Sequence, residues 1–269
     1  MNPGTSGRWL YLVVGPAGAG KTTYCDALAR ALPGLSMADD LDGLMELVRL
    51  ERDVVAARER DDVPEFIRSS LAIADSLPLA GRHATESAFE AARTGLIPYP
   101  DIRVLSDGFE ILTPEVWDWV ISWAARGLSD SRIASLQFAR GLDPEYLEAV
   151  GCTSDLVYDR AFKLVLKEVH RKTDLLIIRV DASLETRLRR NENRRLRGEH
   201  SVAEQVMKSV YASDPFTATW FDKSRGFVRV GERRIPVWNI DNSRTIAPDL
   251  LADEADREVS KALRFFADA

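Results

Sequence analysis

The sequence contains few cysteines and no long hydrophobic run. Cys25 and Cys152 are the two cysteines among 269 residues, and neither belongs to a C-x-x-C or Cys/His cluster. Their separation argues against a disulfide scaffold and against a zinc site, and it favours a reducing compartment. No apolar stretch approaches the roughly 20 residues that cross a bilayer. We therefore expect a cytoplasmic protein without a membrane partner.

The sequence also lacks an excess of positive charge. Asp and Glu number 42 against 36 Lys and Arg, and the formal net charge is −6. No overall field attracts nucleic acid or an anionic membrane, so we expect no nucleic-acid partner, although a local basic groove stays open. Lysine is scarce: seven of the 36 basic residues are lysines, and the other 29 are arginines, whose planar groups match phosphate oxygens.

Short apolar runs separated by amphipathic segments predict the fold. Runs at residues 9–14, 102–106, 175–180 and 236–240, with a shorter one at 35–38, are typical of buried strands, and helical spacing fills the intervals. Strands that alternate with helices form a parallel sheet covered on both faces. We predict an α/β fold with a doubly wound parallel sheet of about five strands.

The same pattern predicts a single domain over residues 8–269. Residues 1–7 are polar and glycine-rich, and we expect them to form a flexible tail. We expect residues 109–151 to form a helical insertion into the core. Residues 187–201 are rich in arginine, and we expect them to form a lid.

A glycine-rich motif directly follows the first predicted strand. Its sequence, Gly15-Pro16-Ala17-Gly18-Ala19-Gly20-Lys21-Thr22, satisfies G-x-x-x-x-G-K-[S/T], the pattern of a phosphate-binding P-loop. The glycines let successive backbone N–H groups converge on one anion, and the following helix adds the positive end of its dipole. The alternative is a chance glycine turn. The four fixed positions arise by accident only about once in a hundred chains of this length.

The P-loop predicts ATP and Mg²⁺ as cofactors. Lys21 can reach the outer phosphates, and the Thr22 hydroxyl can ligate Mg²⁺. A P-loop specifies the phosphate donor and leaves the acceptor open. The predicted nucleotide-binding residues are Gly15, Ala17, Gly18, Ala19, Gly20, Lys21, Thr22 and Thr23.

An acidic residue ends the second long strand candidate. The run "IRVLSDGFE" brings Asp107 to a strand end, and ligands of open α/β sheets bind at the carboxyl ends of strands. A carboxylate there can hold Mg²⁺ together with Thr22, or accept the proton of an attacking hydroxyl. The alternative is a simple turn, because Asp-Gly is a strong turn signal.

Three stretches resemble thymidylate kinases. The stretch "LPLAGRHATESAFEAARTGLIPYPDIRVLSDGF" resembles their substrate-binding helix and the strand after it, which implies that Arg82 contacts the acceptor's phosphate and Asp107 lies beside the transferred group. The stretch "LLIIRVDASLETRLRRN" is similar to the segment that starts their lid, which implies that Arg190 packs against adenine. "VWNIDNS" is similar to their last strand, which implies that Asp241 lies near the base.

Two features depart from the thymidylate kinase pattern. Gly108 stands where the family has an arginine after the aspartate, and Asp39-Asp40 stands near the place of the family's "TREPG" segment. Carboxylates at that place would repel the phosphate of a nucleotide. An uncharged hydroxyl compound is therefore an open alternative as acceptor, with Asp40 or Asp107 hydrogen-bonding or deprotonating it.

Six arginines lie within eleven residues of the predicted lid, at 187, 189, 190, 194, 195 and 197. One alternative is a solvated helix face. The other is a lid whose arginines stabilise the charge that develops in phosphoryl transfer. We predict Arg190 and Arg194 as the acting pair, with Arg187 and Arg195 behind them.

The sequence thus predicts a kinase that transfers the γ-phosphoryl group of ATP to a small-molecule acceptor, either a nucleoside or a nucleoside monophosphate. Lys21, Asp107, Arg190 and Arg194 are the predicted catalytic residues, and Asp40, Arg82 and Asp107 the predicted acceptor-binding residues. Kinases for a non-nucleotide hydroxyl or a nucleic-acid hydroxyl, and a regulatory P-loop NTPase, stay open. So does a homodimer.

Overall fold

The structure is a computed structural model, and it describes most of the chain. The described residues are 7–40, 102–105, 108–111, 116–197, 202, 204–217, 221–222, 226–244 and 248–268.

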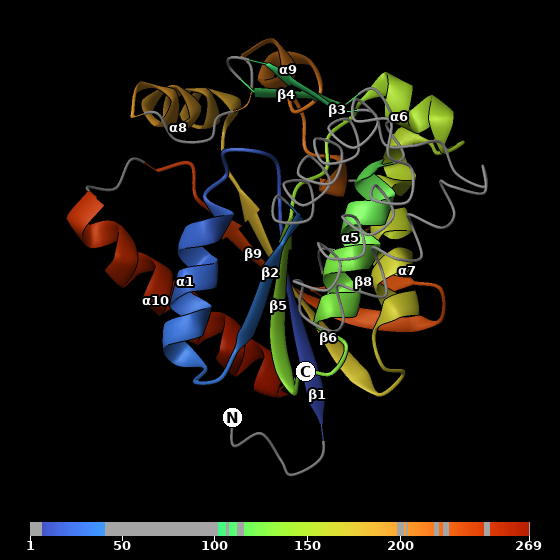
Figure 1. Cartoon of the computed structure of the whole chain (residues 1–269). Coiled ribbons are helices and arrows are strands. Elements are labelled where there is room, and N and C mark those ends of the chain that lie inside the picture. The colour runs from blue at the N-terminus through green and yellow to red at the C-terminus, as the bar shows by residue number, and fades with distance from the viewer. Residues whose placement is uncertain are drawn as a thin grey trace, which may run out of the picture.

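A central sheet of seven strands runs through the molecule in the order β2-β5-β1-β6-β9-β8-β7 (Figure 1). Its first five members are parallel to one another, and β8 and β7 extend the sheet as antiparallel strands. The parallel strands are β1 (Arg8–Val14), β2 (Ser36–Asp39), β5 (Ile133–Phe138), β6 (Thr173–Asp181) and β9 (Arg233–Asp241). The antiparallel ones are β7 (Phe221–Asp222) and β8 (Phe227–Val230). The predicted α/β fold with about five parallel strands is confirmed.

Helices cover both faces of this sheet (Figure 1). On one face α1 (Lys21–Ala31) packs against α10 (Pro248–Asp268). On the other α5 (Val116–Gly127) packs against α7 (Val157–Glu168). The remaining helical segments are α6 (Pro144–Ala149), α8 (Leu184–Leu196), α9 (Glu204–Ser209) and the 3₁₀ turns Ser154–Leu156 and Pro215–Thr217.

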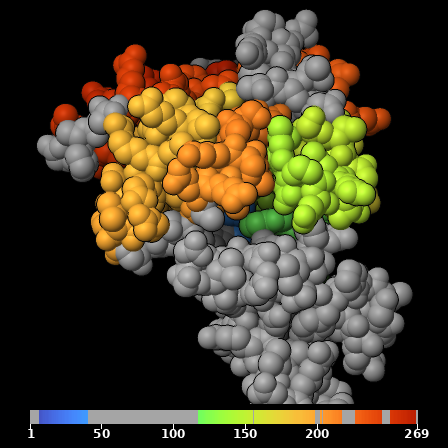
Figure 2. Space-filling view, turned by 90° about the horizontal axis from the view of Figure 1, so that it is seen from above, coloured from blue at the N-terminus to red at the C-terminus, as the bar shows by residue number. Residues whose placement is uncertain are grey.

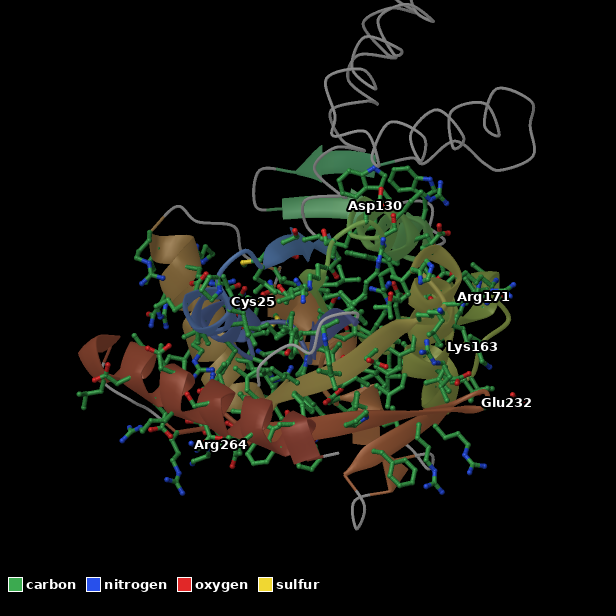
Figure 3. The ribbon with its side chains drawn as sticks, turned by 90° about the horizontal axis from the view of Figure 1, so that it is seen from below. Cys25, Asp130, Lys163, Arg171, Glu232 and Arg264 are labelled. Atoms are coloured by element: carbon green, nitrogen blue, oxygen red, sulfur yellow. The ribbon has the colours of Figure 1, made fainter. Side chains whose placement is uncertain are left out.

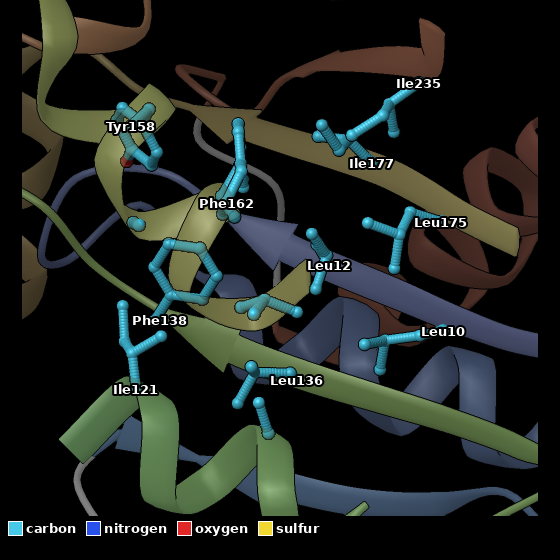
Figure 4. Close-up of a cluster of buried hydrophobic side chains, with 14 of the residues drawn as sticks. Leu10, Leu12, Ile121, Leu136, Phe138, Tyr158, Phe162, Leu175, Ile177 and Ile235 are labelled. Carbon is cyan, nitrogen blue, oxygen red and sulfur yellow. The ribbon is translucent and has the colours of Figure 1, made fainter. Parts of the chain in front are cut away.

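The strand β1 shows why the sheet is covered on both sides. Successive side chains of a strand point to opposite faces. Leu10 and Leu12 accordingly belong to the core beneath α5 and α7, where they lie among Phe138, Leu175 and Ile177 (Figure 4). Tyr11 and Val13 belong to the second core, beneath α1 and α10. A continuous apolar run is therefore buried on both faces, as the sequence predicted.

Charged side chains lie at the periphery. Lys163, Arg171, Glu232 and Arg264 point away from the centre of the molecule, whereas Cys25 lies inside (Figure 3). No helix in the described part of the chain is both long and apolar enough to span a membrane.

The strand predicted at residues 102–106 does not belong to the central sheet. Residues Ile102–Leu105 form β3, which pairs antiparallel with β4 (Gly108–Ile111) in a separate two-stranded sheet. Only two residues separate Leu105 from its partner Gly108, which is the spacing of a tight hairpin. The prediction of a parallel strand was wrong, because this apolar run pairs antiparallel with the segment that directly follows it in the chain.

The position next to β1 is filled by β5, within the segment predicted as a helical insertion. The strand β5 pairs with β1 on one side and with β2 on the other, so residues 109–151 contribute a central strand as well as helices. Its sequence, IASLQF, includes the polar Ser135 and Gln137 and is short, which weakened its apolar signal. The segment predicted as a helical insertion therefore also contributes a strand to the central sheet.

Candidate functional site

The P-loop lies at the carboxyl end of β1 and leads directly into α1. Gly15, Gly18 and Gly20 all have positive φ, and Gly20 caps the N-terminus of α1 at φ 96°. A β-carbon at Gly20 would lie 2.6 Å from Asn242 Nδ2, and one at Gly15 would lie 2.0 Å from the Val180 carbonyl oxygen. Only glycine fits these two positions, so the backbone can form a tight cradle against β6 and the end of β9.

The ammonium group of Lys21 lies inside this cradle. The Lys21 residue is 8% exposed, and its Nζ donates hydrogen bonds to the carbonyl oxygens of Gly15 and Pro16, both at 3.1 Å. Burial lowers the pKa of Lys21, and the negative charges of Asp40 and, more weakly, Asp39 oppose that shift. Lys21 thus connects the P-loop electrostatically with the end of β2.

Two side chains hold the P-loop, one from the residue after β9 and one from α8. The Ala19 carbonyl oxygen accepts hydrogen bonds from Asn242 Nδ2 at 2.7 Å and from Arg190 Nη1 at 3.1 Å. Arg190 Nη2 also donates to the Asn242 carbonyl oxygen at 3.0 Å. Arg190 therefore lies on the P-loop backbone, although it comes from α8.

The other predicted lid arginines occupy three different environments. Arg187 is 3% exposed and donates to the carbonyl oxygens of Ala182, Tyr211 and Ala212, so it ties α8 to the segment after α9. Figure 2 shows the side of the molecule that carries these helices, with α9 between α8 and α6. Arg195 is exposed and pairs with Glu192. Arg194 is half-buried, and its charge contributes to lowering the pKa of Lys21.

The two carboxylates at the end of β2 turn to different partners. Asp39 Oδ2 accepts a hydrogen bond of 2.6 Å from Gln137 Nε2, and the same nitrogen lies 3.3 Å from Thr22 Oγ1. Asp40 is 9% exposed, and its Oδ2 accepts a hydrogen bond of 3.0 Å from the backbone N–H of Ala139.

Arg140 supports Asp40 from the loop after β5. It is 4% exposed, its Nη1 lies 3.9 Å from Asp40 Oδ2, and it donates to the carbonyl oxygens of Ala139 and Trp117. Its guanidinium carbon also lies 5.6 Å from the centre of the Phe138 ring. Asp40 is thus a buried carboxylate kept in place beside a buried cation.

Oxygen ligands for a divalent cation are present next to the P-loop. Thr22 Oγ1 and Asp39 Oδ2 both lie within 3.3 Å of one nitrogen of Gln137, and hydroxyl and carboxylate oxygens are the ligands that Mg²⁺ prefers. No group of three or more His, Cys, Asp or Glu side chains that could hold a metal occurs among the residues that the structure describes. The residues therefore fit an ion that takes its other ligands from phosphates and water.

Of the remaining predicted residues, the structure describes only Asp241. Asp241 ends β9, but it is exposed and its Oδ1 accepts a hydrogen bond of 3.0 Å from the backbone N–H of Ser243. Hydrogen bonds from Ser243 lower the pKa of Asp241. Arg82 and Asp107 lie outside the described residues.

Sequence reasoning missed three residues that the structure brings to this site: Gln137, Arg140 and Asn242. Gln137 and Arg140 were overlooked because β5 was not recognised as a strand. Asn242 directly follows the strand run "VWNID", and its position at a strand end was a signal that could have found it.

Comparison with known proteins gives likenesses in structure only. No known protein family matches this chain, and no curated protein matches it. An unliganded sugar kinase from Janibacter aligns over 95% of this chain and 95% of its own, at 12% identity and a TM-score of 0.41. A gluconokinase from Sinorhizobium meliloti aligns over 97% of this chain and 94% of its own, at 14% identity and a TM-score of 0.37. At these values the likeness does not identify the substrate of this chain.

Proposed function

We propose that this protein is an ATP-dependent kinase that transfers the γ-phosphoryl group to a hydroxyl group of a small, uncharged molecule. The observation that carries the proposal is Asp40, a buried carboxylate held by the Ala139 N–H at 3.0 Å, whose charge acts on the P-loop lysine Lys21. A phosphate cradle and a carboxylate that can accept a proton thus share one end of the sheet.

The donor half of the reaction follows from the P-loop. The backbone N–H groups at the start of α1 and the Lys21 ammonium group hold the phosphates, with the positive end of the helix dipole behind them. Thr22 and Asp39 would hold Mg²⁺, which supplies neutralisation of charge on the phosphates when it is bound. Arg190 orients the loop through the Ala19 carbonyl group, and Arg194 adds positive charge near Lys21.

The acceptor half needs a base. Asp40 accepts the proton of the acceptor hydroxyl as its oxygen forms a bond to the γ-phosphorus, while the bond from that phosphorus to the bridging oxygen breaks and ADP leaves. General base catalysis of this kind contributes about 10²–10⁴-fold to rate. Asp39 and Asp40 together repel an anionic acceptor. Arg140 is already engaged with two backbone carbonyl oxygens. A hydroxyl compound without phosphate, such as a nucleoside, sugar or polyol, therefore fits better than a nucleoside monophosphate.

The acceptor can be found by a binding screen followed by an activity assay. Nucleosides, nucleoside monophosphates, sugars, sugar acids, polyols and inositols are added to the protein with Mg²⁺ and a non-hydrolysable ATP analogue. The melting temperature rises with RT ln(1+[L]/Kd), so the acceptor stands out. We expect an uncharged hydroxyl compound, and ATP-dependent transfer to it. Selective binding of a nucleoside monophosphate contradicts the acceptor class. Fast phosphate release without any acceptor indicates an NTPase instead.

The role of Asp40 is tested by Asp40→Asn. We expect kcat with the identified acceptor to fall by about 10²–10⁴-fold while ATP affinity changes less than about threefold. The matched control is Asp26→Asn, at an exposed position of α1. Unchanged kcat in Asp40→Asn would remove Asp40 as the base.

A further inference from the structure

The amide of Gln137 bridges three elements around the P-loop. It lies near the end of β5, the strand that pairs with β1. Its Nε2 donates to Asp39 Oδ2 at 2.6 Å and lies 3.3 Å from Thr22 Oγ1, and its Oε1 accepts from the Cys25 thiol at 3.3 Å. One side chain thus joins β2 to α1 through β5.

The chemistry of its partners fixes the orientation of this amide. An ionised Asp39 carboxylate can only accept hydrogen bonds, so the NH₂ group of Gln137 must face it. The amide oxygen then faces Cys25, and burial raises the pKa of that thiol to about 12, which keeps it a donor. Both ends of the amide are in use, and its two N–H bonds point toward the two oxygens.

An amide differs from a carboxylate here in charge as well as in hydrogen bonding. If position 137 held a glutamate, its carboxylate would lie 2.6 Å from that of Asp39, and one of the two would have to be protonated. The neutral Gln137 instead draws Asp39 toward Thr22. It brings one negative charge and one hydroxyl oxygen together, without competing for a cation itself.

We propose that Gln137 is the positioning residue for the divalent cation that accompanies ATP. It holds Thr22 Oγ1 and the Asp39 carboxylate as neighbouring ligands, so the gain in ATP affinity that Mg²⁺ produces depends on its amide. The inference rests on the proposed function only in taking a metal–nucleotide complex as the donor. Residues that orient metal ligands in this way typically change metal affinity by about 10–100-fold when they are removed.

Calorimetry tests this inference without any acceptor or turnover. ATP binding is measured with Mg²⁺ and with EDTA for the wild type and for Gln137→Met, and circular dichroism and melting temperature verify folding. We expect Gln137→Met to lose about tenfold or more of the Mg²⁺-dependent gain, with affinity in EDTA changed less than twofold. The matched control Cys25→Ala removes only the contact at the amide oxygen and is expected to keep that gain within twofold.

A double-mutant cycle with Thr22→Val separates positioning from general destabilisation. Because Gln137 is proposed to position Thr22 and Asp39 as one pair of ligands, the double variant should lose less of the Mg²⁺-dependent gain than the sum of the two single losses. Thr22 is exposed, so its variant retains the core even if Gln137→Met does not fold.

Two outcomes overturn the inference: additive losses in the cycle, or a wild-type gain preserved in Gln137→Met. The proposed function is tested separately. Binding of Mg²⁺–ATP that depends on Gln137, with no transfer to any acceptor, refutes the kinase and leaves the role of Gln137 intact.

Discussion

The P-loop and the end of β2 interact electrostatically through Lys21, yet they are built in different ways. The P-loop is shaped by glycines and by backbone groups, and the side chains that support it, Asn242 and Arg190, bind its Ala19 carbonyl oxygen. The end of β2 presents two carboxylates that have different partners. Gln137, within β5, donates to Asp39, and the backbone N–H of Ala139, just after β5, donates to Asp40.

The P-loop and the β2–β5 part of the site therefore differ in how strongly their chemistry depends on particular side chains. The backbone N–H groups and the helix dipole of the cradle do not depend on the side chains of the neighbouring strand ends. The carboxylate half depends on particular side chains, so its chemistry can change by single substitutions. We infer that the donor half is generic and that the β2–β5 half determines the acceptor.

The largest effect is expected at the point where the halves meet. Under the proposed function, Lys21→Met should reduce turnover at least a hundredfold, because the developing charge on the transferred group would lose the ammonium group of the P-loop. Burial lowers the pKa of Lys21, so the charged lysine opposes folding at pH 7, whereas the variant loses the hydrogen bonds to the Gly15 and Pro16 carbonyl oxygens. Because these two effects oppose each other, we expect only a small change in the melting temperature.

Steady-state kinetics and thermal melts measure both quantities for Lys21→Met. The control is Lys163→Met, at an exposed position. Near-normal turnover in Lys21→Met would contradict the proposed role of the P-loop. Lys21 is the only buried lysine among the described residues, so no other buried lysine among them could replace it.

The next effect concerns the support of the donor half. Arg187→Met should cost about 2 kcal/mol in the free energy of unfolding, roughly 4–8 °C in Tm, because three carbonyl oxygens lose their donor. Arg195→Met, in the same helix, should leave Tm nearly unchanged because Arg195 is exposed. Calorimetric melts compare them. Equal shifts would mean that α8 is held by other contacts.

A smaller effect is expected within the cradle. Gly20→Ala should weaken ATP binding about tenfold (about 1.4 kcal/mol), because a β-carbon at φ 96° would lie 2.6 Å from Asn242 Nδ2. Gly34→Ala is the matched control: its φ is 81°, but no heavy atom lies within 4 Å of the new carbon. It should lose some stability and keep its ATP affinity. If both variants bound ATP equally well, close contact with Asn242 would not shape the loop.

The smallest effect appears at alkaline pH and involves Cys25, which contacts Gln137. Burial, and secondly the charge of Asp39, raise the pKa of its thiol from 9.0 to about 12. The folded state therefore keeps a proton that the unfolded state loses above pH 9, so stability is present below pH 9 and lost as pH rises toward 12.

Thermal melts between pH 7.5 and 10 measure this dependence. The wild type should lose stability more steeply than Cys25→Ala above pH 9, by at most about 1.4 kcal/mol per pH unit. Cys152→Ala, which leaves the buried thiol in place, should follow the wild type. Parallel curves for the wild type and Cys25→Ala would show that the thiol does not titrate as its burial requires.

The P-loop half of the site could be predicted from the sequence and the β2–β5 half only partly. The P-loop is a contiguous motif, and the strand before it and the helix after it are local features. The strands around 175–180 and 236–240 were predictable because both are apolar runs. The strand β5 was not, because Ser135 and Gln137 interrupt its apolar character, and its partners lie far away in the chain.

Asp40 was predicted from its place after a strand candidate, but its partners were not. Ala139 lies 99 positions further along the chain, so no local pattern connects the two. The arginine-rich segment shows the same limit: its pattern alone could not separate buried Arg187 from exposed Arg195.

The sequence by itself determined that β1 is buried on both faces and that a phosphate cradle follows it, because periodicity, glycine conformation and helix dipoles act over a few residues. Only the tertiary structure decided that β5 rather than residues 102–105 lies beside β1, and that Gln137, Asp39 and Thr22 meet at one point. The physical reason is that strand order and the contacts at the strand ends arise when distant segments pack into one sheet, which local chemistry does not specify.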